Sequence, residues 1–381
     1  MPRQKNFKRL VRSRMAKTGE SYTTARSQFV PASTALPRPA ADPDAGALAR
    51  ALAPSTVNPL TGAPFTEELL FGLGGGIGFA YLTFAYTGWT SVNLEGRFNA
   101  LYFEKKGVVE TACGRLGLPV RVQQLTTPEL AAKRLRQALD ATPEVILTVD
   151  QARLAGDATP TEVGCYPYPV TVSADGPDLA VTGLPRGRIT LGWSELVAAR
   201  WTQAKKYGGL FRIGPPTDAT DVRAALATAI GRTADCLLEP SRTTFDGNFG
   251  IPGIHKWARL LTDPRNPKGW PKLFGDPESL AEARSAVVRG LGGAATRPLY
   301  AAFLEQAASL LDEPGLIEIA DAYGDLGDRW AALVQVADRP DATGADLAAE
   351  LPDLAAAEEA AAASLRATIG RTTGLAGGGQ R

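Results

Sequence analysis

Residues 66–79 read Thr-Glu-Glu-Leu-Leu-Phe-Gly-Leu-Gly-Gly-Gly-Ile-Gly-Phe, a short apolar segment that runs into a glycine-rich turn. Thr66 is a suitable N-cap residue, and the two glutamates after it are favourable beside the positive end of a helix. The glycines do not follow the patterns that bind phosphate. No Lys-Ser/Thr pair follows them, and the sixth position of a GxGxxG motif counted from Gly72 is Ile77. We therefore expect a helix whose glycines let a neighbouring element pack closely against the backbone.

The segments around this stretch mix helix and strand signals. Residues 145–149 form a continuous apolar and β-branched run, which predicts a buried strand. Shorter strands are expected at 170–173, 179–182 and 188–191. Helices are expected at 108–116, at 128–140 with a proline in the first turn, and from a Ser194 cap to residue 204. The mixture predicts an α+β domain over residues 47–214.

From about residue 215 the apolar residues recur at three- and four-residue spacing, which predicts a mostly helical domain over 215–340. The expected helices lie at 218–231, 276–290, 296–312, 315–322 and 327–338. Residues 241–275 are rich in Pro, Gly and Trp and are expected to form a loop. The Ala- and Glu-rich segment 341–381 is expected to be one exposed helix followed by a disordered tail.

The N-terminal region differs from the rest of the chain in charge. The whole chain carries a net charge of +1, from 41 Lys/Arg and 40 Asp/Glu. Residues 1–30 hold eight Lys/Arg and one acid, net +7, so the remainder has 33 Lys/Arg against 39 acids, net −6. Residues 1–29 are expected to form a basic helical hairpin and residues 30–46 a Pro/Ala-rich linker. The polyanion-binding candidates in the hairpin are Lys5, Lys8, Arg9, Arg12, Arg14, Lys17 and Arg26.

Basic side chains this close together can neutralise several phosphates jointly. The expected partner of residues 1–30 is therefore a nucleic acid, a ribosome or other ribonucleoprotein, or an acidic protein. The alternative is a solvated arm, or a tether to the acidic remainder of the chain. Readout of a base sequence is not indicated.

One histidine and three cysteines limit the chemistry of any site. His255 alone cannot supply a multi-histidine metal site, and the cysteines form no CxxC pair, so neither a metal nor a cofactor is expected. Cys165 is the candidate nucleophile, against the commoner role of a small buried or turn cysteine. Cys113 and Cys236 are expected to pack in the core, and His255 to be structural or exposed.

The sequence also bears on the compartment. No apolar run approaches the roughly 18 residues of a membrane span, and the basic N-terminus lacks the apolar region of a signal peptide. A sparse, odd number of cysteines suits a reducing environment. We expect a soluble cytoplasmic protein with no membrane partner.

Residues 66–79 resemble the signature of the butirosin biosynthesis protein H N-terminal family. The similarity continues through the helix ending at 115–117, the strand ending at Val149-Asp150, and residues 189–200. The second half is similar to a domain of unknown function that is usually fused behind that family. The resemblance covers roughly residues 47–340. Its motif residues are Gly72, Gly74, Gly76, Gly78, Trp257, Trp270 and Arg297.

The resemblance implies a papain-like fold and acyl transfer, in which a cysteine takes an acyl group from an acyl-carrier-protein thioester and passes it to an amine. A thiolate suits that task, and a histidine supplies the base. The family has a His-Cys pair at the start of its first helix, and here that pair falls on Asp42-Pro43. The family's later histidine falls on Tyr168 or Pro167. Neither residue can act as a base near neutral pH.

Three functions follow as hypotheses. The first is a non-catalytic relative of the acyltransferases that binds a partner through the basic N-terminal arm. The second is an active acyltransferase or amidohydrolase with relocated chemistry, in which Cys165 is the nucleophile. The third is a structural or assembly role.

Overall fold

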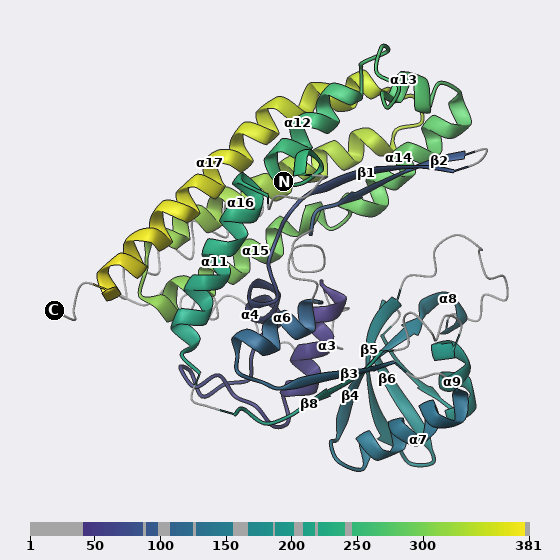
Figure 1. The fold of residues 1–381 in the computed structure, drawn as a ribbon, viewed down its shortest axis with the longest axis vertical. Coiled ribbons are helices and arrows are strands. Elements are labelled where there is room, and N and C mark those ends of the chain that lie inside the picture. Colours follow the sequence, from purple (N-terminus) through teal and green to yellow (C-terminus); the bar gives the residue numbers. More distant parts are fainter. Residues whose placement is uncertain are drawn as a thin grey trace. The chain divides into compact units, whose positions relative to one another are not determined.

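The computed structural model describes residues 41–86, 89–97, 107–124, 127–154, 167–185, 187–201, 209–217, 220–240 and 246–377. Over these ranges the protein is a mixed α and β structure, as predicted (Figure 1). The basic hairpin with Lys5, Lys8, Arg9, Arg12, Arg14, Lys17 and Arg26 lies outside the described residues, and so does Cys165.

In the described residues, six strands form one sheet in the order β3-β8-β4-β5-β6-β7, and every neighbouring pair is antiparallel. The predicted strand 145–149 is confirmed at the centre, where Leu147 lies opposite Val170. The tight turn between β5 and β6 contains Gly176 at a φ of 62°, a backbone conformation that glycine adopts readily. The strand bounds are β3 Val120–Gln124, β4 Glu144–Asp150, β5 Pro167–Asp175, β6 Asp178–Leu184, β7 Gly187–Leu191 and β8 Gly209–Ile213.

Helices cover both faces of this sheet because its strands alternate their side chains between two cores. Thr171 of β5 points toward α3 (Pro43–Leu52), and its hydroxyl donates to the Ala47 carbonyl at 3.3 Å. Val170 and Val172, its neighbours in the strand, belong to the core on the other face. That core is closed by α7 (Pro128–Leu139), α8 (Gln151–Leu154) and α9 (Trp193–Trp201), as Figure 1 shows.

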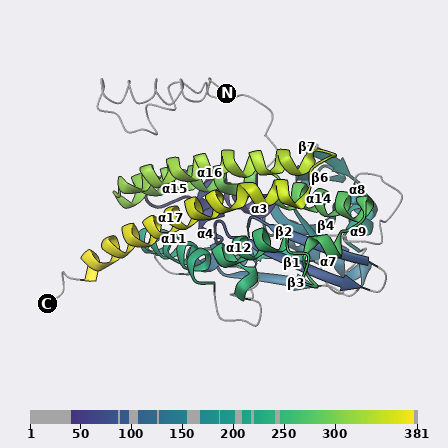
Figure 2. The same ribbon diagram turned by 90° about the horizontal axis from the view of Figure 1, so that it is seen from above.

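The second region is built from helices and one hairpin. The hairpin, β1 (Ala80–Tyr86) and β2 (Trp89–Glu95), packs against α12 (Gly250–Leu260) and α14 (Pro277–Leu291). Around it lie α11 (Val222–Leu238), α13 (Trp270–Leu273), α15 (Arg297–Leu311), α16 (Gly315–Asp338) and α17 (Gly344–Gly377). Helices α15, α16 and α17 run side by side in succession (Figure 2).

The two regions share a hydrophobic core through α4 (Glu67–Leu73) and α6 (Val108–Arg115). The predicted cap is confirmed, because the Thr66 hydroxyl accepts from the Leu69 N–H at 3.2 Å. The close packing predicted for the glycines is confirmed as well. A Cβ on Gly72 would lie 2.3 Å from the Phe303 ring of α15, so no larger residue fits there.

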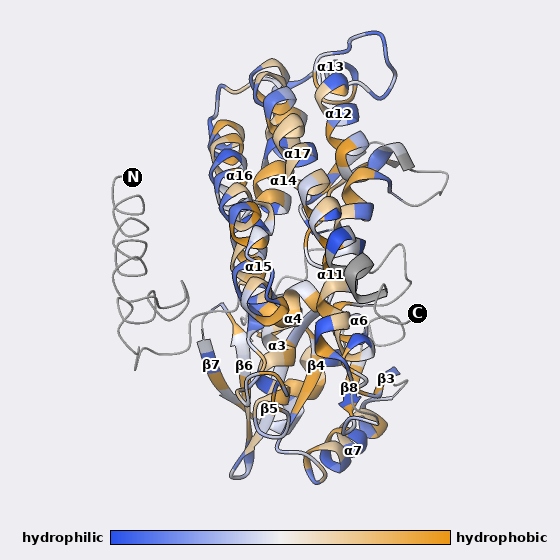
Figure 3. Ribbon diagram, turned by 90° about the vertical axis from the view of Figure 1, so that its left-hand side faces the viewer, coloured by the Kyte–Doolittle hydropathy of each residue, from blue (hydrophilic) through white to orange (hydrophobic). Residues whose placement is uncertain are grey.

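Several sequence expectations were wrong in the helical region. The loop expected at 241–275 contains α12 and α13, because Trp257 and Trp270 anchor helices in the core rather than a surface loop. The two helices expected at 315–338 are one, α16. The tail helix α17 was expected to be exposed, yet Leu347, Leu351 and Leu365 are fully buried. Hydrophobic and hydrophilic residues alternate along α16 and α17 (Figure 3), which gives each helix a buried face.

Two helix starts also differ from expectation. Residues 43–46 were assigned to the linker, but α3 begins at Pro43 behind an Asp42 cap. This cap and proline are a helix start signal that the Pro/Ala-rich composition concealed. Ser194 was expected to cap α9, but it lies inside the first turn, and the Gly192 N–H donates to the Glu195 carboxylate at 2.9 Å. None of the described helices is both long and apolar enough to cross a membrane.

Candidate functional site

The position that the family resemblance gives to the His-Cys pair lies at the first turn of α3. Asp42 caps the helix, since its Oδ1 accepts from the Ala45 N–H at 2.8 Å. Pro43 occupies the first helical position, where the missing N–H removes no hydrogen bond. The Asp42 N–H donates to the Glu67 Oε1 of α4 at 2.7 Å. The starts of α3 and α4 therefore pack against each other here. The side chains at this point are those of Asp42, Pro43 and Glu67.

Arg97 supplies the positive charge of this cluster. It follows β2 and Gly96, its Nη1 pairs with the Asp42 carboxylate, and the same nitrogen lies 3.6 Å from the Asp44 Oδ2. The guanidinium stacks over the Phe71 ring, 5.1 Å from its centroid. Its Nη2 is buried and has no hydrogen-bond partner among the described residues. We call Asp42, Asp44, Glu67 and Arg97 the α3 cluster.

One carboxyl group of the α3 cluster, that of Asp44, has a raised pKa. Burial raises the pKa of Asp44 to about 6, and the charges of Asp42 and Glu110 raise it further, while Arg97 opposes the shift. Burial also raises the pKa of Glu67, against the hydrogen bond from the Asp42 backbone. Such a group can exchange a proton with a bound molecule or hold a cation. The polar contacts that the structure shows for Asp42, Asp44 and Arg97 include neither a thiol nor an imidazole.

The position of the family's later histidine lies on the strand that packs against α3. Tyr168 of β5 donates its hydroxyl to the Gly183 carbonyl at 3.1 Å. Burial raises the pKa of Tyr168 above its ordinary value, and the charges of Asp42 and Asp44 act in the same direction. Next to it, Arg50 of α3 donates from Nε to the Thr171 hydroxyl at 3.1 Å, and burial lowers its pKa. Tyr168 is thus held as a hydrogen-bond donor, and it is no base near neutral pH.

The remaining candidates for covalent chemistry lie in the described residues as follows. Cys113 is buried in α6, and burial and the charge of Glu110 raise the pKa of its thiol to about 12. Cys236 is buried in α11, so both cysteines pack in the core as predicted. His255 is exposed on α12. Within the described part of the chain, no three His, Cys, Asp or Glu side chains are arranged to hold a metal ion.

Two of the family motif residues, Gly78 and Arg297, hold the backbone beside the α3 cluster. Gly78 donates its N–H to the Gly96 carbonyl at 3.1 Å, and the buried Arg297 donates to the same carbonyl from Nη1 at 2.7 Å. A Cβ on Gly74 would overlap Val108, and one on Gly76 would overlap Tyr300. Trp257 and Trp270 are buried. Gly96 directly precedes Arg97, so these bonds fix the backbone from which Arg97 reaches α3.

Sequence reasoning missed most of the α3 cluster. The Asp42-Pro43 start signal was available, but Arg97 lies in no motif and follows a hairpin that was not predicted. Asp44 and Glu67 look like ordinary first-turn acids, which are common because they favour the positive end of a helix. These residues form a candidate site only because the fold brings their side chains together.

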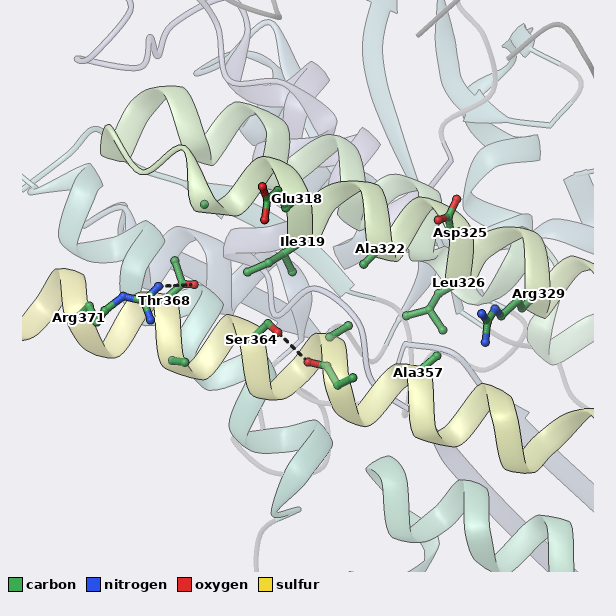
Figure 4. Close-up of a pocket in the computed structure, with 14 residues that line it drawn as sticks. Glu318, Ile319, Ala322, Asp325, Leu326, Arg329, Ala357, Ser364, Thr368 and Arg371 are labelled. Carbon is green, nitrogen blue, oxygen red and sulfur yellow. Dashed lines mark hydrogen bonds between the residues drawn. The ribbon is translucent and has the colours of Figure 1, made fainter. Parts of the chain in front are cut away.

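Apart from the α3 cluster, a hollow runs between α16 and α17, with a volume of about 570 Å³ (Figure 4). Its floor holds Ile319, Leu326 and several alanines, and its margins carry Glu318, Asp325, Arg329 and Arg371. Arg371 donates to the Thr368 hydroxyl at 3.2 Å, and Ser364 to the Ala360 carbonyl at 2.9 Å. Charges of both signs and a floor without aromatic rings select no class of ligand.

Comparison with known families gives two matches. Residues 43–155 match the family described as Butirosin biosynthesis protein H, N-terminal, and residues 194–365 match Domain of unknown function (DUF4872). Both confirm the resemblance found in the sequence, in the same order along the chain. The first match begins at Pro43, the first residue of α3, and ends before β5 and Tyr168. No curated protein matches this chain.

Proposed function

We propose, from the premise that residues 43–155 are a butirosin biosynthesis protein H N-terminal domain, that this protein is a non-catalytic relative of the carrier-protein-dependent amine acyltransferases and works as a binding protein. The observation that carries the proposal is the α3 cluster. Two aspartates and an arginine meet where the resemblance places a thiol and an imidazole.

Acyl transfer from a thioester needs a nucleophile that attacks the carbonyl and a base that activates it. Pro43 carries no nucleophilic atom, and the Asp42 carboxylate is engaged by the Ala45 N–H and by Arg97. Tyr168 keeps its proton because its pKa lies above the ordinary value of 10.0. These positions therefore supply neither the nucleophile nor the base that acyl transfer needs.

The proposal includes a papain-like fold for the first domain. Its support is that α3, the helix whose start would carry the thiol, packs directly against β5, the strand that would carry the later histidine. On this proposal the catalytic groups are replaced, while a helix packed on a sheet, the arrangement that would hold them, is kept.

Binding is assigned to the basic N-terminal arm, residues 1–30. Its support is the sequence, since eight Lys/Arg face one acid there while the remainder of the chain is net negative. The proposed partner is polyanionic: a nucleic acid, a ribonucleoprotein or an acidic protein.

Catalysis is tested with the full chain, an N-acetylcysteamine thioester and a series of primary amines. We expect no acyl transfer above the rate without protein, and the same result for Cys165→Ala. Acyl transfer by the intact protein that is lost in Cys165→Ala, and retained in a Cys236→Ala control, would overturn the proposal in favour of relocated chemistry.

Binding is tested by capture from native lysate with the full chain and with residues 31–381, with and without nuclease. We expect the capture to need residues 1–30 and to weaken steeply as salt rises, because released counterions drive phosphate contacts. Capture that is unchanged by the deletion and insensitive to salt contradicts the role of the arm.

A further inference from the structure

A second site candidate lies in the helical region, between the β1 strand and α12. The hollow there has a volume of about 590 Å³, which is within the range of small-molecule sites, roughly 300–1,000 Å³. Its walls include the aromatic residues Tyr81, Phe84 and Phe249, and the buried Leu260 of α12. Phe84 is 42% exposed, so its ring is accessible to a ligand in the hollow.

The charged residues described at this hollow are of one sign. Lys256 and Lys268 line it, and no acidic residue occurs among the described lining residues. The Lys256 ammonium contacts the Asn248 side-chain oxygen, and no ion pair of either lysine occurs among the described residues. Burial, with the charges of Lys268 and Arg259, lowers the pKa of Lys256.

The sequence around the two lysines is also basic. Residues 255–272 contain five Lys/Arg and one acid, in a chain whose residues 31–381 are net negative. The single acid, Asp263, is engaged in its own turn, since its Oδ1 accepts from the N–H groups of Arg265 at 2.9 Å and Asn266 at 3.2 Å. Within the described part of the chain, neither lysine at this aromatic hollow is therefore paired with a carboxylate.

Tyr81 anchors the strand that forms one wall of the hollow. It is almost fully buried, and its hydroxyl oxygen accepts from the Trp270 indole N–H at 3.1 Å. This bond holds β1 in place, so the wall is preformed.

We propose that this hollow binds a small organic anion with an apolar body. The anionic end, a carboxylate or a phosphate monoester, lies between Lys256 and Lys268, and the apolar body lies against Phe84, Leu82 and Leu260. The walls exclude water from the apolar part, while the two ammonium groups compensate the charge of the anion. This site is independent of the α3 cluster and of the basic arm.

The proposal is tested by calorimetric titration of the full chain with octanoate, octyl phosphate, octanol and octyltrimethylammonium. We expect one of the two anions to bind about tenfold or more tightly than octanol, because a hydrogen bond to a charged group contributes about 1.5–3 kcal/mol. Which anion binds more tightly identifies the ligand as a carboxylate or a phosphate. The quaternary ammonium should not bind.

Substitutions distinguish binding at this site from nonspecific binding elsewhere on the protein. Lys256→Met should weaken anion binding about tenfold and leave octanol unchanged, and Lys268→Met on the exposed rim should act in the same direction without any risk to folding. Lys272→Met is the matched control, since Lys272 is exposed and does not line the hollow. Phe84→Ser should weaken the anion and octanol alike.

Three outcomes would overturn the proposal: octanol binding as tightly as both anions, Lys272→Met weakening the anion as much as Lys256→Met, or no anion binding at millimolar concentration. A single-stranded oligonucleotide that binds this face, and that octanoate does not displace, would also overturn it in favour of a polyanion surface.

Discussion

The protein contains two arginine–carboxylate clusters that differ in exposure. They are connected through Gly96, whose carbonyl accepts from Arg297 of one cluster and which directly precedes Arg97 of the other. In the helical region Arg297 and Glu358 pair at 2.6 Å with both side chains fully buried. In the α3 cluster the side chains of Arg97, Asp42 and Asp44 are 16%, 4% and 38% exposed. The same chemistry thus occurs once sealed in the core and once at a partly open site.

The sealed pair makes several hydrogen bonds to its surroundings, while Arg297 Nη2 and Glu358 Oε2 are buried without a hydrogen-bond partner among the described residues. One oxygen of Glu358 accepts from Arg297 and from the Trp330 indole, each at 2.6 Å. Arg297 also donates to the Ala295 carbonyl at 2.8 Å, next to Ala295 and Thr296, which have positive φ angles of 53° and 63°. Non-glycine residues adopt that conformation at a cost, so the arginine holds a strained turn in place. The difference indicates that the sealed pair is a purely internal contact, whereas the α3 cluster is in part accessible to solvent through Asp44 and Arg97.

The largest effect is expected from breaking the sealed pair. Glu358→Ala leaves a buried guanidinium without its carboxylate, and it should lower the free energy of unfolding by about 3–5 kcal/mol. Urea denaturation measures the loss. Glu359→Ala, the adjacent exposed residue, is the control and should change stability by less than about 0.5 kcal/mol. Equal effects of the two substitutions would refute the contrast.

A smaller loss is expected at the open cluster. Asp42→Ala removes the cap of α3, which costs about 1–2 kcal/mol, and it also removes the partner of Arg97. Asp276→Ala is the comparison, because Asp276 caps α14 by a bond to the Ser279 N–H at 2.9 Å without an arginine. Urea denaturation should show a larger loss for Asp42→Ala. Losses of the same size would mean that the Arg97 contact adds nothing to stability.

The smallest effect is a pH dependence at Asp44. Its pKa in the folded protein, about 6, is above the value of 3.8 that applies when the chain is unfolded. The folded state therefore holds the extra proton between these values, and this group's contribution to stability falls as the pH rises from about 4 to about 6. Because 38% of the side chain is exposed, solvent screening keeps the change small.

Urea denaturation of the wild type and Asp44→Asn at intervals from pH 4 to pH 7 measures this dependence. The variant should gain stability relative to the wild type as the pH rises through that window and stay level above it. A difference between the two proteins that is constant with pH would show that Asp44 is ionised throughout.

The local signals in the sequence were reliable where a single turn decides the structure. The Thr66 cap, the Pro128 start of α7 and the end of α6 before Gly117 at a φ of 64° all occur as predicted. Caps, prolines and positive-φ glycines act within a few residues, so no tertiary contact is needed to predict them.

The elements that the sequence did not predict depend on distant partners. The hairpin of β1 and β2 is stable because α12 and α14 cover it, more than 150 residues further along the chain. The Ala-rich α17 is buried because α11, α16 and α12 pack around its apolar face. An alanine-rich helix looks exposed until the helices that cover it are known.

The sequence by itself determined that no histidine or cysteine stands at positions 42 and 43, and that the first 30 residues are basic while the rest is acidic. Only the tertiary structure decided that Arg97 meets Asp42, 55 residues away, and that Arg297 meets Glu358, 61 residues away. The reason is that residue identity limits which chemistry is possible, whereas the exposure and pairing of a charge are set by segments that the fold brings together.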